Sequence, residues 1–262
     1  MKKYFSERKL NILISIAAVA TMWIVWIVVY YSVRNDYIIP SFQDTFASIW
    51  KDCLARTAFW RAFANTLRRT AMAFLISFAL AAALAALGAI SEKVSAFIKP
   101  FMVFLRTLPT LAIILILLIW TSPRVAPVIV TVLVLFPMIH AQFVAAIEGI
   151  DGGLREMAKV YGIGRKERIF KMYLPLISPN IFSQTGANIS LGLKIMVSAE
   201  VLANTYRSLG GQMQEARLFL EMPRLAALTL IAVVAGLVFD VLFSQLKRLT
   251  RKWSAKEGGN AN

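Results

Sequence analysis

The sequence predicts an all-α, polytopic membrane protein with about six transmembrane helices. Of the 262 residues, 58% are hydrophobic and 16% are charged, and the mean hydropathy is +0.66, whereas soluble domains carry about 25% charged residues. A membrane helix needs about 20 mainly apolar residues, because unpaired backbone groups in hydrocarbon cost several kcal/mol each. Six segments meet that need: residues 10–33, 70–91, 100–120, 125–147, 177–202 and 225–246.

The first two of these spans contain no charged residue. Span 10–33 follows a basic N-terminus like that of a signal peptide, but its apolar core is far longer than a cleavable one, so we expect it to remain as an anchor. Span 70–91 has alanines four residues apart, which predicts close helix packing. Between the two spans, aromatic residues at helical spacing after Pro40 and Ser41 predict a short amphipathic helix on the outer surface.

The later spans carry isolated polar and charged side chains. The third contains Arg106 and is joined to the fourth by a tight turn, and the sixth contains Asp240. Polar groups inside a membrane are costly unless they face a bundle interior or water. The candidates for lining a passage are therefore His140, Gln142, Gln184, Asn188, Lys194 and Glu200. Lys194 could instead reach toward an interface, and His140, the single histidine, fits a bundle residue better than a metal ligand.

The net charge of +15 does not indicate nucleic acid binding, because the basic residues lie in blocks between apolar runs. With both termini inside, 17 Lys and Arg residues would face the cytoplasm and 10 the outside. This bias predicts two cytoplasmic termini. The single cysteine, Cys53, cannot form an internal disulfide or a thiolate metal site. The polar tail 256–262 is expected to be disordered.

A charged segment interrupts the apolar runs at residues 148–175, and it contains EMAKVYGIGRKERIFKMYLP. Its first part predicts a helix with one apolar face, made by Leu154, Met157, Ala158 and Tyr161. Gly162 and Gly164 should end that helix. From Arg165 a second short helix should follow, with Ile169, Phe170 and Tyr173 as an apolar patch. We expect Pro175 to end it, because proline cannot continue a helical hydrogen-bond ladder.

The spacing in this segment resembles the EAA loop of permease subunits from bacterial ABC importers. That pattern is Glu-Ala-Ala, three residues, Gly, nine residues, Ile, one residue and Leu-Pro; the matching positions here are Glu156, Met157, Ala158, Gly162, Met172, Leu174 and Pro175. The two methionine replacements keep an adaptable apolar surface. The stretches IIPSF, NTLRRTAMAF, LRTLPTLAIILILLIW and GLKIMVSAEVL resemble the nitrate/sulfonate/taurine-type branch of that family.

The resemblance implies a type I ABC importer permease (MetI-like) fold in a bacterial inner membrane. It also implies that segment 148–175 is a cytoplasmic coupling loop that docks on a separate ATPase through Glu156, Met157, Ala158, Tyr161, Gly162, Ile169, Leu174 and Pro175. The implied partners are two ATPase subunits with ATP and Mg, a second permease copy, an external solute-binding protein and the lipid bilayer. The chain has no Gly-x4-Gly-Lys-Ser/Thr phosphate loop, so we expect no nucleotide, cofactor, metal or catalytic residue in it.

Two other classes of protein fit less well. An ion-coupled secondary transporter predicts inverted repeats and several intramembrane carboxylates, but the sequence shows no repeat and offers only Glu200 and Asp240. A membrane enzyme needs clustered His, Asp, Glu or Cys residues, and this chain has one His and one Cys. Within the importer class, the cargo stays open among nitrate, sulfonates, taurine and vitamin precursors.

Overall fold

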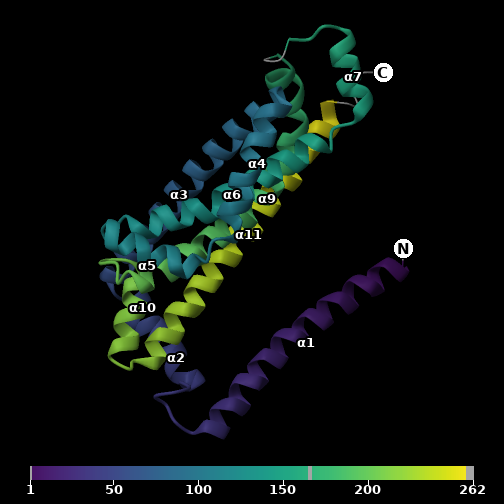
Figure 1. Cartoon of the computed structure of the whole chain (residues 1–262). Coiled ribbons are helices and arrows are strands. Elements are labelled where there is room, and N and C mark those ends of the chain that lie inside the picture. The colour runs from purple at the N-terminus through teal and green to yellow at the C-terminus, as the bar shows by residue number, and fades with distance from the viewer. Residues whose placement is uncertain (1, 165–166, 258–262) are drawn as a thin grey trace.

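The computed structural model describes residues 2–164 and 167–257, and they form helices joined by short turns. In chain order the helices are α1 Lys2–Val33, α2 Phe42–Ser48, η1 Ile49–Leu54, α3 Thr57–Ile90, α4 Glu92–Thr107, α5 Thr110–Trp120, α6 Ala126–Glu148, α7 Gly152–Val160, η2 Arg168–Tyr173, α9 Leu174–Leu202, α10 Leu209–Leu218 and α11 Met222–Glu257; η1 and η2 are π-helical. Figure 1 shows an elongated bundle of α3, α6, α9 and α11, with α7 at one end and α10 at the other.

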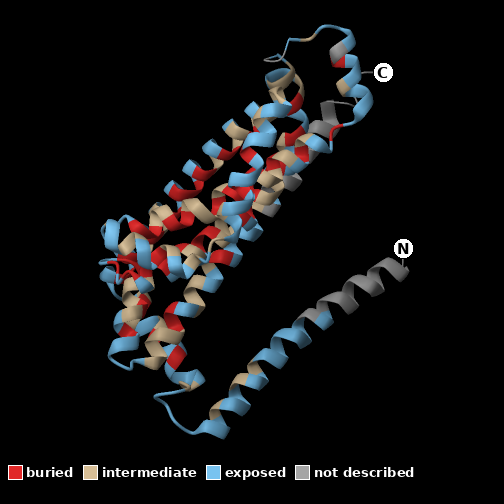
Figure 2. Cartoon of the chain, in the orientation of Figure 1, coloured by how far each residue is buried: buried red, intermediate tan, exposed pale blue. Residues whose placement is uncertain are grey.

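The core lies where α3, α6 and α9 meet, and Figure 2 shows the buried residues along their facing sides. Small residues of α3, such as Ala81 and Ala85, are buried against Leu135 and Ile139 of α6. On α9, a Cβ added to Gly192 would lie 2.9 Å from the Leu135 side chain. Small side chains therefore let these helices approach closely, as the alanine spacing in α3 predicted.

Four described helices are long and apolar enough to cross a membrane: α1, α3, α6 and α11. The pair α4 and α5 adds a fifth if it counts as one bent span. Segment 177–202, predicted as a span, lies in the continuous helix α9. Helix α9 is not among the helices that are long and apolar enough to cross a membrane. Its polar side chains lower its hydropathy, but they lie in a helix packed between α6 and α11. By length and composition, the described residues thus give four candidate spans, or five with the bent pair, and the sixth, segment 177–202, stays a prediction.

Segment 100–120 is not the single straight span that the apolar run predicted. Helix α4 ends at Thr107, α5 begins at Thr110, and the two are bent by 93°. Leu108 is extended, with a ψ of 127°, because a residue that precedes a proline is disfavoured in the α-helical region. Helix α3 contains almost all of the predicted span 70–91 and extends before it to Thr57.

Helix α1 lies apart from the bundle, to which α2 connects it (Figure 1). The predicted α2 is confirmed, and the Ser41 hydroxyl caps it by accepting the Asp44 N–H at 3.0 Å. Trp23 of α1 lies edge-on against Phe42 of α2, with ring centroids 4.8 Å apart. At the other terminus, residues 256 and 257 of the expected tail belong to α11, and the rest, 258–262, lies outside the described residues.

Candidate functional site

The segment that resembled a coupling loop lies at the α7 end of the bundle (Figure 1). The Asp151 carboxylate starts α7 by accepting the N–H of Gly153 at 2.6 Å and of Leu154 at 3.3 Å. Gly162 ends it with a φ of +64°, and the Ile163 N–H reaches back to the Ala158 carbonyl at 3.0 Å. This is the bond of a glycine-terminated helix end, so the predicted glycine stop is confirmed.

An exposed apolar surface runs along α7. Val160 is 84% exposed and Tyr161 78%, and Leu154 and Met157 are also exposed. Ala158, predicted to share this face, is fully buried, so it does not belong to that surface in this conformation. Val160 takes its place, three residues after Met157. Val160 was not predicted as part of this surface, because the predicted face followed the helical spacing that runs from Leu154 to Tyr161. Glu156 and Gly162 are exposed beside the surface.

Arginine side chains tie this segment to neighbouring backbone. The Arg155 guanidinium donates to the carbonyls of Glu148 and Ile150 at the end of α6, the latter through Nη2 at 2.7 Å. Arg168 donates to the Ile163 carbonyl at 3.2 Å. Arg155 therefore ties α7 to the end of α6, and Arg168 closes the turn that follows α7. The sequence analysis assigned no such role to Arg155.

Pro175 does not end a helix, contrary to the prediction. The backbone stays helical through Leu174, with φ −57° and ψ −47°, and Pro175 lies in the first turn of α9. The Leu174 N–H bonds to the Ile169 carbonyl, five residues back. This wider π turn comes just before the proline, which lacks an N–H and would clash within a regular turn. The predicted start of the second helix, at residues 165–166, lies outside the described residues.

Two predicted docking residues, Ile169 and Leu174, instead line an apolar pocket within the chain. The pocket is formed with alanines of α3, among them Ala85, and with Phe143 of α6 and Tyr173. Ile169 is half-buried and packs against the main core. Ile169 therefore packs the segment against the bundle, whereas Leu174 is 47% exposed as well as lining the pocket, so its docking role stays a prediction.

Most of the polar residues predicted to line a passage have partners. Gln142 of α6 and Asn188 of α9 exchange two hydrogen bonds, at 3.0 and 2.7 Å. Gln184 donates to the Asn180 side chain at 3.1 Å. His140 is buried, whereas Lys194 is exposed on α9. Of the two charged candidates, Lys194 is thus the one whose side chain is exposed on the surface of the chain.

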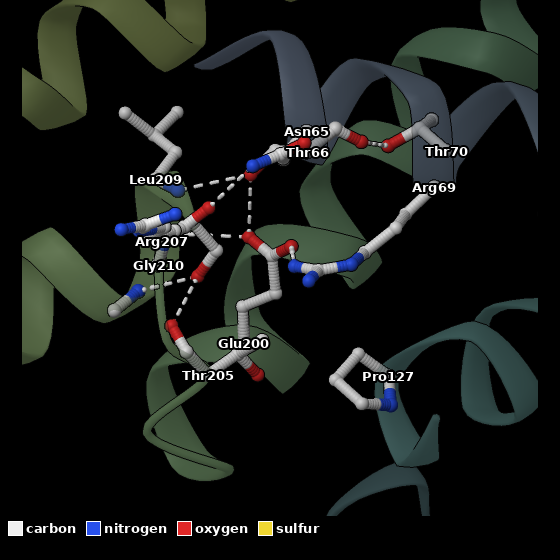
Figure 3. Close-up of polar contacts among 12 residues, drawn as sticks. Asn65, Thr66, Arg69, Thr70, Pro127, Glu200, Thr205, Arg207, Leu209 and Gly210 are labelled. Carbon is white, nitrogen blue, oxygen red and sulfur yellow. Dashed lines mark hydrogen bonds and ion pairs between the residues drawn. The ribbon is translucent and has the colours of Figure 1, made fainter. Parts of the chain in front are cut away.

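Glu200 is held inside a polar cluster that joins α3, α9 and α10, made by Thr66, Arg69, Glu200, Leu209 and Gly210 (Figure 3). Its side chain is fully buried, so it does not line an open passage in this conformation, contrary to its prediction as a lining residue. Neither Thr66 nor Arg69 was predicted as a partner of Glu200. We call this cluster the latch.

The chain matches known membrane transport proteins. Residues 76–252 match the family described as "Binding-protein-dependent transport system inner membrane component". SsuC of Bacillus subtilis (strain 168), named as an aliphatic sulfonates transport permease, is 28% identical over 188 residues, which cover 71% of this chain and 67% of SsuC. The taurine transport system permease protein TauC of Escherichia coli (strain K12) is 24% identical over 193 residues, 73% of this chain and 70% of TauC.

The fold is also that of solved ABC transporters. A bacterial ABC transporter involved in the import of the acidic polysaccharide alginate matches with a TM-score of 0.64 at 18% identity, over 94% of this chain and 98% of that one. An amino acid ABC transporter matches with a TM-score of 0.62 at 20% identity, over 73% of this chain and 93% of that one. The bent α4–α5 pair and the detached α1 thus occur in a chain with a known permease fold.

Proposed function

Because this chain belongs to the family of binding-protein-dependent inner membrane transport components and is the permease subunit of an ABC importer, we propose that its α7 surface receives the separate ATPase. The observation that carries the proposal is the exposure of Val160 and Tyr161 at the tip of the bundle. Large apolar side chains gathered on a water-facing segment mark a site for a protein partner. The Leu-Pro end of the segment runs without a break into α9, so a displacement of α7 is passed to the bundle.

The same geometry supports the remaining parts of the assembly. In our proposal, two copies of this chain enclose the passage, and each docks on one ATPase subunit that binds ATP and Mg. Both termini and the α7 end face the cytoplasm, as the 17 to 10 distribution of basic residues favours. Lys194 and Ser198 are exposed one helical turn apart on α9, and this face of α9 would border the passage.

We propose that the cargo is a small organic anion of the sulfonate type. Lys194 supports this because an exposed lysine within a membrane-spanning helix is stable only near water or an anion. The relatives named for aliphatic sulfonates and taurine support it independently. Mass spectrometry of the ligand that co-purifies with the external binding protein tests the assignment: a sulfonate or related anion supports it, and a sugar or a cation contradicts it.

Substitution of Gly162 tests the coupling role. Gly162 has a φ of +64° and nothing within 4 Å of an added Cβ, so any side chain there is disfavoured by backbone conformation alone, by about 1–2 kcal/mol. We expect Gly162→Ala to lower uptake, and Gly162→Val to abolish it, without loss of membrane insertion. The matched control is Gly164→Ala, where the φ is ordinary and the nearest atom is 3.9 Å away. Normal uptake in Gly162→Val would contradict the role.

A further inference from the structure

Glu200 receives hydrogen bonds from α3 and α10 (Figure 3), and α10 lies at the end of the bundle opposite α7 (Figure 1). Its Oε1 accepts from the Arg69 guanidinium at 2.9 Å. Its Oε2 accepts from the Thr66 hydroxyl at 2.7 Å and from the Gly210 N–H at 3.3 Å. Thr66 Oγ1 in turn accepts the Leu209 N–H at 2.9 Å. One buried carboxylate therefore joins the end of α9 to α3 and to the start of α10.

The turn between α9 and α10 is built tightly around this carboxylate. Asn204 and Arg207 have φ angles of 46° and 51°. Thr205 donates its hydroxyl to the Pro123 carbonyl in the α5–α6 turn at 2.7 Å. A Cβ on Gly210 would lie 2.5 Å from the Glu200 Cβ. The turn is thus held by the latch and by the hydrogen bond from Thr205 to Pro123. It also requires glycine at position 210, where a side chain would collide with Glu200.

Cys53 reports whether α10 is in place. It is fully buried in a cluster with Leu209 and Met213 of α10 and Phe59 of α3. Burial raises the pKa of its thiol to about 11, which further suppresses reaction with thiol reagents because the thiolate is the nucleophile. No other cysteine exists in the sequence. Because α10 contributes Leu209 and Met213 to this cluster, beside residues of α9 and α11, we expect a movement of α10 away from α3 to open the cluster and expose a single, native thiol.

We propose that Glu200 is a positioning residue for transport, and that it keeps the latch closed throughout the cycle. The adjoining ends of α3, α9 and α10 then move as one body when the coupling segment shifts α9. The latch suits this role because its buried charges are paired, and opening it would leave both Glu200 and Arg69 unpaired away from water. This inference rests on the proposed function, since that function supplies the movement.

The first test is maleimide labelling of Cys53 in the assembled transporter, without nucleotide and with vanadate-trapped ATP. We expect wild-type Cys53 to be protected in both states. Glu200→Gln replaces one acceptor oxygen by an NH2 group, so the donors from Arg69, Thr66 and Gly210 can no longer all be satisfied. The latch should then open more often, and labelling of Cys53 should accelerate roughly tenfold or more. The matched control is Glu215→Gln, which breaks one half-exposed ion pair of α10 with Arg224 and should stay protected. Reaction of wild-type Cys53 in either state, or full protection in Glu200→Gln, would overturn the inference.

The second readout is the number of solute molecules imported per ATP. We expect Glu200→Gln to lower this ratio severalfold while Glu200→Asp, which keeps the charge, restores part of it. A merely structural role would lower protein yield but leave the ratio unchanged, and that result would refute the proposal. If Glu200→Gln does not assemble, Thr66→Val keeps the ion pair but removes both the donor to Glu200 and the acceptor of the Leu209 N–H, and it should give an intermediate effect. Labelling without nucleotide needs neither ATP hydrolysis nor transport, so failure of the proposed function would leave the comparison of wild type with Glu200→Gln in that state interpretable.

Discussion

At the residue scale, the polar side chains inside the bundle are bound to one another across helices. Gln142 and Asn188 satisfy each other's amide groups, and Glu200 is satisfied by Arg69, Thr66 and Gly210. Such pairing is what makes polar residues tolerable at membrane depth. The interior of this permease is therefore held by a few specific polar bonds in addition to apolar packing.

Replacement of Asn188 by leucine should show what the amide pair contributes. Asn188→Leu leaves the Gln142 side chain without its partner, which costs roughly 1–3 kcal/mol of unfolding free energy. We expect the low end of that range, because hydrogen bonds between membrane helices contribute less than this on average. The double variant Gln142→Leu with Asn188→Leu removes both polar groups and should be less destabilised than the single one. Thermal unfolding in detergent measures both. A double variant that loses the sum of the two single losses would contradict the pairing.

The sequence indicated which single residues matter, but it did not indicate their partners. Gln142, Asn188 and Glu200 stood out because polar groups in apolar runs are costly. Arg69 was not linked to Glu200, since the two lie 131 positions apart and no local pattern joins such distant positions. The pairing follows only from the packing of α3 against α9.

At the element scale, the sequence predicted a helix end at a glycine better than it predicted changes of direction or hydrogen bonding at prolines. The end of α7 at Gly162 follows from glycine's access to positive φ, a property of that residue alone. The bend at Leu108 and the continuation through Pro175 were missed. Each depends on how a proline is accommodated by its surroundings: an extended preceding residue in the first case and a π turn in the second.

A charge placed on the α7 surface should weaken ATPase binding. Val160 is 84% exposed, so Val160→Asp should cost the permease little stability. In the complex the new carboxylate would lie in an apolar contact, where we expect a loss of about 2 kcal/mol of binding free energy, or some thirtyfold in affinity. Co-purification of the ATPase in detergent measures it. Gly152→Asp is the control, because it adds the same charge on the first turn of α7 in open space. Equal ATPase recovery from both variants would refute the docking surface.

At the scale of the whole molecule, α9 connects the two ends that the proposals concern. It is 29 residues long, about 44 Å at 1.5 Å per residue, and it starts at the coupling segment and ends at the latch. A displacement at the start of α9 can therefore reach the α10 end through one continuous helix. The all-α class and the permease fold were predicted from composition and from the EAA spacing, whereas the count of six spans stays a prediction, because α9 falls below the hydropathy of a typical span and α4–α5 is bent.

The most direct test of ATP-driven import is solute uptake into proteoliposomes that contain this chain. We expect uptake of the ligand carried by the external binding protein only when the ATPase subunit, ATP with Mg and the binding protein are all present. The ATPase variant that binds but does not hydrolyse ATP serves as the control and should give no uptake. Accumulation of solute by this chain without the ATPase, driven by an ion gradient alone, would contradict the mechanism.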